Sequence, residues 1–492
     1  MKLSRGRRQA LLTGSAALIA PIFATSCASI PSRPPARRNA ANATVVGPVT
    51  GGDKGWIYRA PVIDLAAAGY VIEEFFVSGA ARSFRLADGE TATFDGDWTT
   101  QADQTAPFTT RIFVARPSDP AKYNGVLLAH WQNVSAGYEN GWPTDAILGG
   151  YAWMAVSAQA DGINGGAGKA QYGLRQWDNA RYGALDHPGD AFSYDIFATA
   201  VSAALGRSAQ APGGPLANLK TETVIALGGS QSALRLATFI NGVHSHRRVF
   251  DGYLLLSHFG VAPPFEERSL ISLFDIAGGG RNAAWSQIAD RGDAPVLVVD
   301  TQAEALMHYR ARQPDTASFR TWEIAGAPHA PPSATHMKDV AGKRDGVVDG
   351  GPAPSTRNVV EWGYASDAAI RFLARWIRDG AEPPRFEPLT IDLSGSHPSY
   401  ALDDVGNVIG GIRPPEVAAA IGVHSAGLPP ANALLGRSVL FDRQRMIEQH
   451  GDRRHFLASW NDAVAKLEAA GLLLPVESQQ VRARAAEYWP AD

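Results

Sequence analysis

The stretch TVIALGGSQSALRLATFI, residues 223–240, changes its pattern in the middle and decides how the chain folds. It begins as a β-branched apolar run typical of a buried strand, passes through Gly228, Gly229 and Ser230, and continues with apolar residues at helical spacing. A sharp strand-to-helix turn forces a serine into a strained backbone conformation and exposes its hydroxyl at the carboxyl edge of a sheet. The pattern therefore predicts Ser230 as a nucleophile.

The residues two before and two after such a serine must be small, because the turn packs tightly. Here they are Gly228 and Ser232, where the usual pattern has glycine at the second place. Shifting the frame to Ser232 would put Leu234 in the crowded position, which favours Ser230. A glycine-rich turn with an incidental serine is the alternative that this stretch leaves open when it is taken alone.

Apolar strand-like runs alternate with amphipathic stretches along the chain, which predicts an α/β fold with a mostly parallel sheet flanked by helices. Several runs lack polar alternation, as expected for strands covered on both faces. We place the core of the domain at about residues 100–380 and a C-terminal extension at about 381–492. The predicted strands are residues 109–117, 125–131, 151–159, 222–229, 250–257, 294–300 and 319–326.

Two later positions complete a catalytic pattern. A serine hydroxyl needs a histidine to take its proton, and a carboxylate must orient that histidine. In the α/β-hydrolase arrangement these residues follow in the order serine, acid, histidine, each beyond the carboxyl end of a strand. Glu304 follows the run APVLVVD, and His329 follows FRTWEIAG. Both the order and the context indicate a triad of Ser230, Glu304 and His329, with Glu304 preferred over Asp300 at the strand end.

An oxyanion hole needs two donors near the nucleophile. The backbone N–H of Gln231 directly follows the serine, and the loop HWQNVSAG after the run 125–131 offers the second donor. The N–H of Gln132 is our first choice there, with Trp131 and Asn133 as alternatives; a purely structural polar turn is also open.

The chain resembles the bacterial exported alpha/beta-hydrolase domain family. In that family the elbow, which is the strand-to-helix turn that carries the serine, reads Gly-x-Ser-Gln-Ser. GGSQSA, NGVLLAHWQNVSAG, DDVGNVIGGIRPP and HGDRRHFLASWNDAVAKLEAAGLLLP are among the motifs that carry this resemblance, which covers about residues 65–475. It implies a single elaborated α/β-hydrolase domain, residues 46–492. The family has glutamate where His130 stands and glycine where Ala233 stands. Its acid region commonly has two acidic residues, at the places of Gln302 and Glu304, so only the second carboxylate is present here.

The first residues are typical of an export signal. MKLSRGRRQ supplies positive charge, and ALLTGSAALIAPIFA is an apolar segment too short to span a bilayer comfortably. The single cysteine, Cys27, directly follows, where a bacterial lipoprotein carries its lipid, although Ala24 stands where leucine is usual. We expect residues 1–27 to be a signal, residues 28–45 to be a flexible tether, and the mature protein to be periplasmic or held at a membrane by Cys27. Ordinary cleavage without an anchor is the alternative.

Composition limits the remaining functions. The formal net charge is only −3 with no basic stripe, which argues against nucleic acid as a partner. No phosphate loop, dinucleotide fingerprint or HExxH motif occurs, so we expect no cofactor and no metal, and nothing implies a protein partner. The leading hypothesis is a serine hydrolase that cleaves a small-molecule carboxylic ester through an acyl-enzyme. A non-catalytic envelope binding protein on the same fold, and an amidase, peptidase or acyltransferase with the same triad, are the alternatives.

Overall fold

The computed structural model describes residues 42–141, 145–208, 210, 213–265, 285–347, 357–426 and 435–490. These residues all belong to one compact unit, Ala36–Asp492. The predicted signal with Cys27, and residues 28–41 of the predicted tether, lie outside the described residues. The end of that tether was placed too late, because residues 43–45 pair with a neighbouring strand; Ala43 packs closely over Gly79, which has no side chain to obstruct it.

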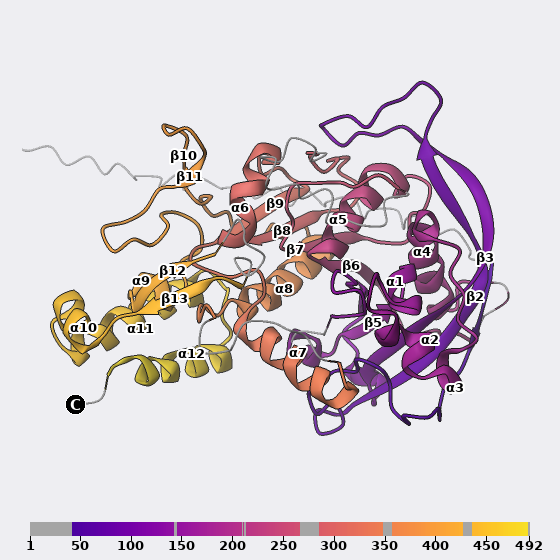
Figure 1. Cartoon of the computed structure of the whole chain (residues 1–492), viewed down its shortest axis with the longest axis horizontal. Coiled ribbons are helices and arrows are strands. Elements are labelled where there is room, and N and C mark those ends of the chain that lie inside the picture. Colours follow the sequence, from indigo (N-terminus) through magenta and orange to yellow (C-terminus); the bar gives the residue numbers. More distant parts are fainter. Residues whose placement is uncertain are drawn as a thin grey trace, which may run out of the picture. The chain divides into compact units, whose positions relative to one another are not determined.

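One large sheet organises the described residues, and it is mostly parallel as predicted (Figure 1). β4 to β9 run parallel to their neighbours, whereas β1, β2 and β3 form an antiparallel end that joins β5. The strand order is β1-β2-β3-β5-β4-β6-β7-β8-β9. The strands are β1 (Ala43–Val46), β2 (Tyr70–Leu86), β3 (Thr100–Pro117), β4 (Val126–Trp131), β5 (Ala152–Val156), β6 (Thr223–Gly229), β7 (Gly252–Leu256), β8 (Val296–Thr301) and β9 (Phe319–Ile324).

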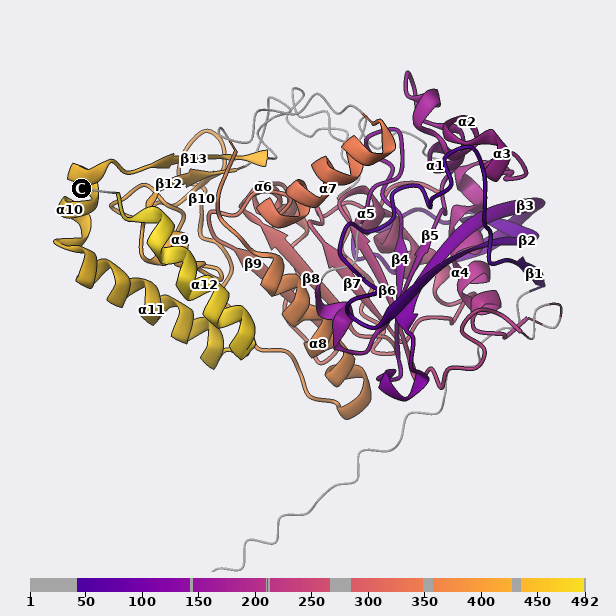
Figure 2. The same ribbon diagram turned by 90° about the horizontal axis from the view of Figure 1, so that it is seen from below.

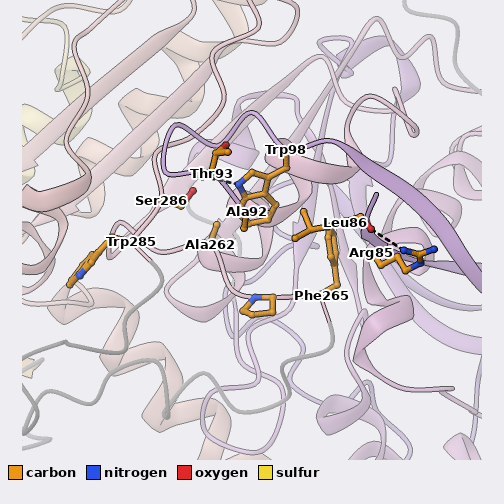
Figure 3. Close-up of a pocket in the computed structure, with 10 residues that line it drawn as sticks. Arg85, Leu86, Ala92, Thr93, Trp98, Ala262, Phe265, Trp285 and Ser286 are labelled. Atoms are coloured by element: carbon orange, nitrogen blue, oxygen red, sulfur yellow. Dashed lines mark hydrogen bonds between the residues drawn. The ribbon is translucent and has the colours of Figure 1, made fainter. Parts of the chain in front are cut away.

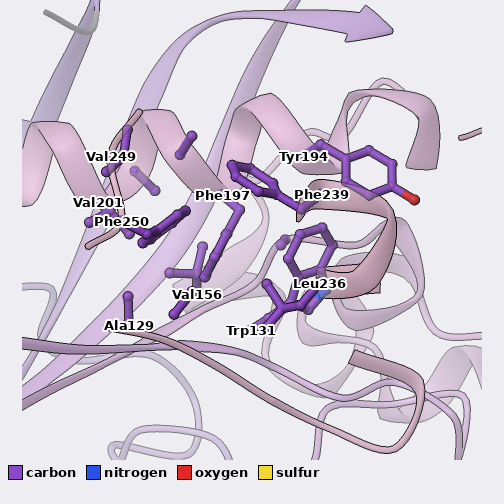
Figure 4. Packing of buried hydrophobic residues seen from close by; sticks show 14 of the residues in the cluster. Ala129, Trp131, Val156, Tyr194, Phe197, Val201, Leu236, Phe239, Val249 and Phe250 are labelled. Carbon is purple, nitrogen blue, oxygen red and sulfur yellow. The ribbon is translucent and has the colours of Figure 1, made fainter. Parts of the chain in front are cut away.

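Helices cover both faces of the sheet, which makes three layers (Figure 2). α4 (Ser193–Ala204) and α5 (Gln231–Thr238) pack on one face, where Trp131, Phe197 and Phe239 belong to a buried cluster (Figure 4). α8 (Gly363–Asp379) packs on the other face. Strands enclosed in this way are apolar on both sides, which explains why the sequence runs lack alternation.

The other helices are shorter or lie in the extension. They are α1 (Ala160–Asn164), α2 (Leu174–Trp177), α3 (Asn179–Tyr182), α6 (Gln302–His308), α7 (Pro332–Asp345), α9 (Pro415–Ala418), α10 (Arg443–His450), α11 (Arg453–Ala469) and α12 (Pro475–Tyr488), with a π-helical turn at Phe239–Val243 after α5. None of the helices in the described ranges is both long and apolar enough to cross a bilayer.

The C-terminal extension packs on the α8 side and along the β9 edge of the sheet. Ile412 forms a bridge with Ile324, accepting from Ala325 N–H at 2.8 Å and donating to Glu323 O at 2.7 Å. Two small antiparallel ladders belong to this extension: β10 (Ile391–Asp392) with β11 (Ser399–Tyr400), and β12 (Gly422–Ser425) with β13 (Arg437–Leu440). Side chains of α11 and α12, such as Trp460 and Val481, share a buried cluster with α8.

Candidate active site

The predicted elbow is present between β6 and α5. Ser230 has φ 57° and ψ −123°, a strained conformation for a residue with a side chain, and it is half-buried. A Cβ on Gly228 would lie 2.7 Å from the carbonyl oxygen of Ser232, so glycine is required there. The turn therefore confirms the strand–serine–helix geometry that the sequence indicated.

Ser232 has a structural position. It is fully buried, its hydroxyl accepts from the N–H of Gly229 at 2.9 Å, and it donates to the carbonyl of the same residue at 2.9 Å. These bonds close the elbow from within the helix. Of the two serines in the motif, Ser230 is the more accessible.

Glu304 and His329 lie together, although 25 residues separate them in the chain. Nδ1 of His329 lies 2.5 Å from Oε1 of Glu304; because a carboxylate only accepts, Nδ1 carries the proton and Nε2 is free to accept another. The second oxygen of Glu304 accepts from the N–H of Thr301 at 2.9 Å and from its hydroxyl at 2.7 Å. These bonds form the N-terminal capping box of α6 and fix the fully buried carboxylate.

The end of β7 holds the serine and the histidine near each other. Leu256 O accepts from the N–H of Ser230 at 2.8 Å, and the next residue, Ser257, donates its hydroxyl to the carbonyl of His329 at 2.9 Å. No hydrogen bond joins Ser230 Oγ to His329 in the described part of the chain. Such bonds are often long in unliganded enzymes and tighten with substrate.

Asp300, the carboxylate at the end of β8, belongs to a different set of contacts. Its Oδ1 accepts from the N–H of His258 at 2.6 Å, and its Oδ2 bonds Nδ1 of His308 at the last turn of α6. Burial raises the pKa of Asp300 to about 6, although the neighbouring His308 acts to lower it. This pair ties the loop after β7 to the helix that carries Glu304, and the sequence analysis did not identify it.

The proposed oxyanion donors differ in their geometry. The N–H of Gln231 is the first of α5 and has no acceptor within its helix. The backbone N–H of Gln132, by contrast, donates to Val156 O at 3.2 Å, so its prediction as the second donor is wrong for this geometry. Strand pairing continues one residue beyond β4 and occupies that amide. The alternative amide of Asn133 is also occupied, by Asn140 O at 2.9 Å.

The side chain of Gln132 has a different environment from its backbone. The residue is 1% exposed, yet neither its carboxamide nitrogen nor its oxygen has a hydrogen-bond partner among the described residues. The following loop lies on the elbow: Asn133 Nδ2 donates to Gly229 O at 2.9 Å, and Val134 N–H donates to the side-chain oxygen of Gln231 at 3.1 Å. The carboxamide of Gln132 is therefore a buried amide with its donor still available, one residue before the loop that contacts the elbow.

A buried network of hydrogen bonds and one ion pair fixes α5 against the end of β4. Trp131 Nε1 donates to Gln159 at 3.0 Å, Gln159 donates to Asp190 at 3.1 Å, and Arg235 of α5 pairs with the same carboxylate at 3.2 Å. These side chains are nine-tenths or more buried. The contacts therefore hold the end of β4 and α5, which follows β6, in a fixed position relative to each other.

Ser230, Glu304 and His329 line neither of two cavities that lie in the described part of the chain. The larger, of about 420 Å³, is lined by Leu86, Trp98, Phe265, Trp285 and others (Figure 3). The smaller, of about 240 Å³, is lined by the residues on either side of His329 together with Arg357 and Arg484 from later parts of the chain. Among the described residues, no group of three or more histidine, cysteine or acidic side chains is arranged to hold a metal ion.

A mostly parallel sheet with a serine on a strained strand-to-helix turn, and a histidine bonded to a carboxylate beyond two later strands, defines the α/β-hydrolase class. The chain belongs to the alpha/beta hydrolase domain family, whose model matches residues 45–483. This confirms the resemblance to an alpha/beta-hydrolase domain family and the α/β-hydrolase fold class. A search of curated proteins found no match.

Solved structures that match part of this chain include several esterases. The esterase Est22 is 11% identical with a TM-score of 0.30, and the alignment covers 57% of this chain and 84% of that one. Brefeldin A esterase, a bacterial homologue of human hormone-sensitive lipase, is 15% identical with a TM-score of 0.26, covering 55% and 77%. A prolyl endopeptidase is 13% identical with a TM-score of 0.28, and the match covers 57% of this chain but only 39% of the endopeptidase.

Proposed function

We propose that the protein is a serine hydrolase that cleaves a carboxylic ester through an acyl-enzyme on Ser230. The hydrogen bond between His329 Nδ1 and Glu304 Oε1 carries this proposal, because it orients a histidine whose second nitrogen can accept the serine proton. The strained backbone of Ser230 gives further support, since such strain is found where a nucleophile must project from the sheet.

The reaction follows from the roles of these groups. Ser230 Oγ attacks the ester carbonyl while His329 Nε2 takes its proton, and the same nitrogen then gives that proton to the departing alcohol. Water attacks the acyl-enzyme in a second round with the same base. Glu304 keeps the imidazole in the required tautomer and stabilises its positive charge, and the Thr301 cap keeps Glu304 in place.

The negative oxygen of the tetrahedral intermediate needs two donors. We assign the first to the N–H of Gln231 and the second to the carboxamide of Gln132 rather than to its backbone. The unpartnered, buried state of that carboxamide supports the assignment. Gln132→Leu should lower kcat roughly 10²–10³-fold, the usual cost of losing one oxyanion donor. An unchanged kcat would show that the Gln132 carboxamide is not the second donor.

An organophosphonate probe tests the whole proposal. Ser230 should be labelled covalently, and Ser230→Ala should remove both labelling and ester hydrolysis, a loss on the order of 10⁶ in turnover. Ser232→Ala is the matched control and should keep its label. Labelling that persists in Ser230→Ala and vanishes in Ser232→Ala would exclude the assignment, and a folded wild-type protein without any labelling would favour the non-catalytic hypothesis.

We also propose that the protein is exported and anchored through lipid on Cys27. The arginine pair Arg7 and Arg8, the short apolar segment and the position of the cysteine support this. Lipid chains give membrane affinity in proportion to their buried methylene groups, so a multiply acylated cysteine would hold the enzyme at a membrane.

A further inference from the structure

A small apolar cluster lies beside all three proposed catalytic residues. Leu234 follows Ser230 by one helical turn, Met307 follows Glu304 by three residues, and the ring of Phe259 lies 5.5 Å from that of His329. These side chains and Val261 form one buried cluster, against which Trp285 packs. The carboxyl edge of the sheet therefore has an apolar wall next to the reacting groups.

The larger cavity continues from this wall. Trp285 lines the cavity as well as packing on the cluster, and Ala262, the residue after Val261, lines it too. On the far side the walls are Leu86, Trp98 and Phe265 (Figure 3). Its volume of about 420 Å³ falls within the range of roughly 300–1,000 Å³ typical of small-molecule sites.

The outer wall of the cavity is held in a defined position. It comes from the loop between β2 and β3, where Phe94 O accepts from Gln287 N–H at 2.7 Å and Asp97 pairs with Arg291 at 2.7 Å. The indole N–H of Trp98 donates to Thr93 O at 2.9 Å, which fixes that ring. The cavity is thus a built feature with its walls bonded to one another.

The chemistry of the walls selects an apolar ligand. Most of the described lining residues are aliphatic or aromatic, and the cation among them, Arg85, already pairs with Asp88 at 2.7 Å and Asp103 at 3.4 Å. Among the side chains of the described lining residues, the indole N–H of Trp285 is the one buried polar group without a hydrogen-bond partner. An ion or sugar would lose its hydration here without adequate replacement, whereas a hydrocarbon group would not.

We propose that this cavity binds an extended apolar substituent of the ester, of about six carbons or more, which reaches it along Phe259 and Trp285. The inference rests on the proposed function and adds the class of substrate. Each methylene group taken out of water contributes about fourfold in affinity, so an eight-carbon chain should be favoured strongly over a two-carbon chain. The substituent can belong to the acyl part or to the alcohol part.

Two ester series distinguish these sources. p-Nitrophenyl acetate, butyrate and octanoate vary the acyl part, and methyl, butyl and octyl acetates vary the alcohol. In one series kcat/KM should rise at least tenfold from the shortest to the longest member. Ala92→Trp, at an exposed lining position, should remove most of that rise and leave the shortest ester within about twofold. Phe94→Trp places the same indole side chain in the same loop but outside the lining residues, and it should change nothing.

A binding measurement separates this inference from the proposed function. In the inactive Ser230→Ala variant, octanoic acid or octanol should bind by titration calorimetry, and Ala92→Trp should weaken that binding at least tenfold while Phe94→Trp does not. If the ligands bind with this pattern but the wild type hydrolyses no ester, the proposed function is rejected, while the inference that the cavity binds apolar groups stands. Hydrolysis without chain-length dependence, or equal effects of Ala92→Trp on short and long ligands, would overturn the inference alone.

Discussion

Glu304→Gln is the substitution that most sharply tests the proposed triad of Ser230, His329 and Glu304. The glutamine keeps the size of the side chain and removes its charge. The two oxygens of Glu304 accept three hydrogen bonds, from His329 on one side and from the backbone and hydroxyl of Thr301 on the other. An amide has one acceptor end and one donor end, so it cannot satisfy both sides. Each orientation of the glutamine fails differently.

If the NH₂ group faces His329, Nδ1 must accept, and the ring proton moves to Nε2, where it blocks removal of the serine proton. If the NH₂ group faces Thr301 instead, it opposes the backbone N–H and breaks the capping box, at a cost of about 1–3 kcal/mol for one unsatisfied buried donor. The first orientation keeps the fold, so the protein should adopt it. Replacing the acid of a serine protease triad by an amide costs roughly 10⁴ in turnover, which corresponds to about 5 kcal/mol of transition-state stabilisation.

The assay is hydrolysis of a p-nitrophenyl ester, with the melting temperature as the control for folding. Glu304→Gln should lose turnover by about four orders of magnitude and stay folded. Asp300→Asn should lower stability more than turnover, since Asp300 holds His258 and His308 rather than His329. The reasoning would be refuted by a folded Glu304→Gln protein with nearly normal turnover alongside a folded but inactive Asp300→Asn.

Three further outcomes are expected. Arg111→Ala should lower the free energy of unfolding in urea by roughly 3–5 kcal/mol, because it leaves Glu139 buried without its cation; a loss below 1 kcal/mol would contradict this. Burial lowers the pKa of His130 from 6.5 to about 4, so as the pH falls the imidazole is protonated in the unfolded chain before it is protonated in the folded protein. The free energy of unfolding should therefore decrease as the pH drops from 6.5 to about 4. In His130→Gln the urea midpoint should depend less on pH over this range. An unchanged pH dependence would show that His130 does not cause the decline. Mass spectrometry should find lipid on an N-terminal Cys27, and Cys27→Ser should release the enzyme from membranes; a different or unmodified N-terminus would reject the anchor.

The positions of seven strands along the chain, and those of the proposed catalytic residues, could be predicted because local sequence indicates where an apolar run ends. An apolar run ends where its strand ends, and the carboxyl ends of parallel strands lie at one edge, so Ser230, Glu304 and His329 were expected at the same edge. The structure has each of them just beyond the end of its strand. The prediction needed the ends of the apolar runs and the order serine, acid, histidine that α/β-hydrolases share.

β2 was not predicted, and its charged residues explain why. Glu73 and Glu74 interrupt the apolar pattern, but Glu74 is 1% exposed and pairs with Arg111 at 3.3 Å and Arg181 at 2.6 Å. These cations are 37 and 107 residues away in the chain. A buried acid whose partners are so distant has the same local pattern as a surface acid, so periodicity cannot reveal it.

The C-terminal helices show the opposite situation, in which the signal was present. Apolar residues continue at helical spacing over about 441–471, but the chain turns at Gly451, with φ 77°, and a new helix begins after Asp452. The carboxylate of Asp452 accepts from the N–H of His455 at 2.8 Å. Glycine followed by an N-capping aspartate marks such a boundary, and it outweighs continuous apolar spacing.

The pairing of β7 with β8 connects the three residues of the proposed triad. Ser230 and His329 are each bonded to the end of β7, through Leu256 O and the hydroxyl of Ser257, and Glu304 is bonded to the end of β8. Ser257 N–H in turn donates to Val299 O at 2.8 Å, which continues the pairing of the two strands. The positions of base and acid therefore follow the register of two central strands. A shift of that register would separate Glu304 from His329 without changing either residue, so the geometry of the proposed triad depends on the sheet.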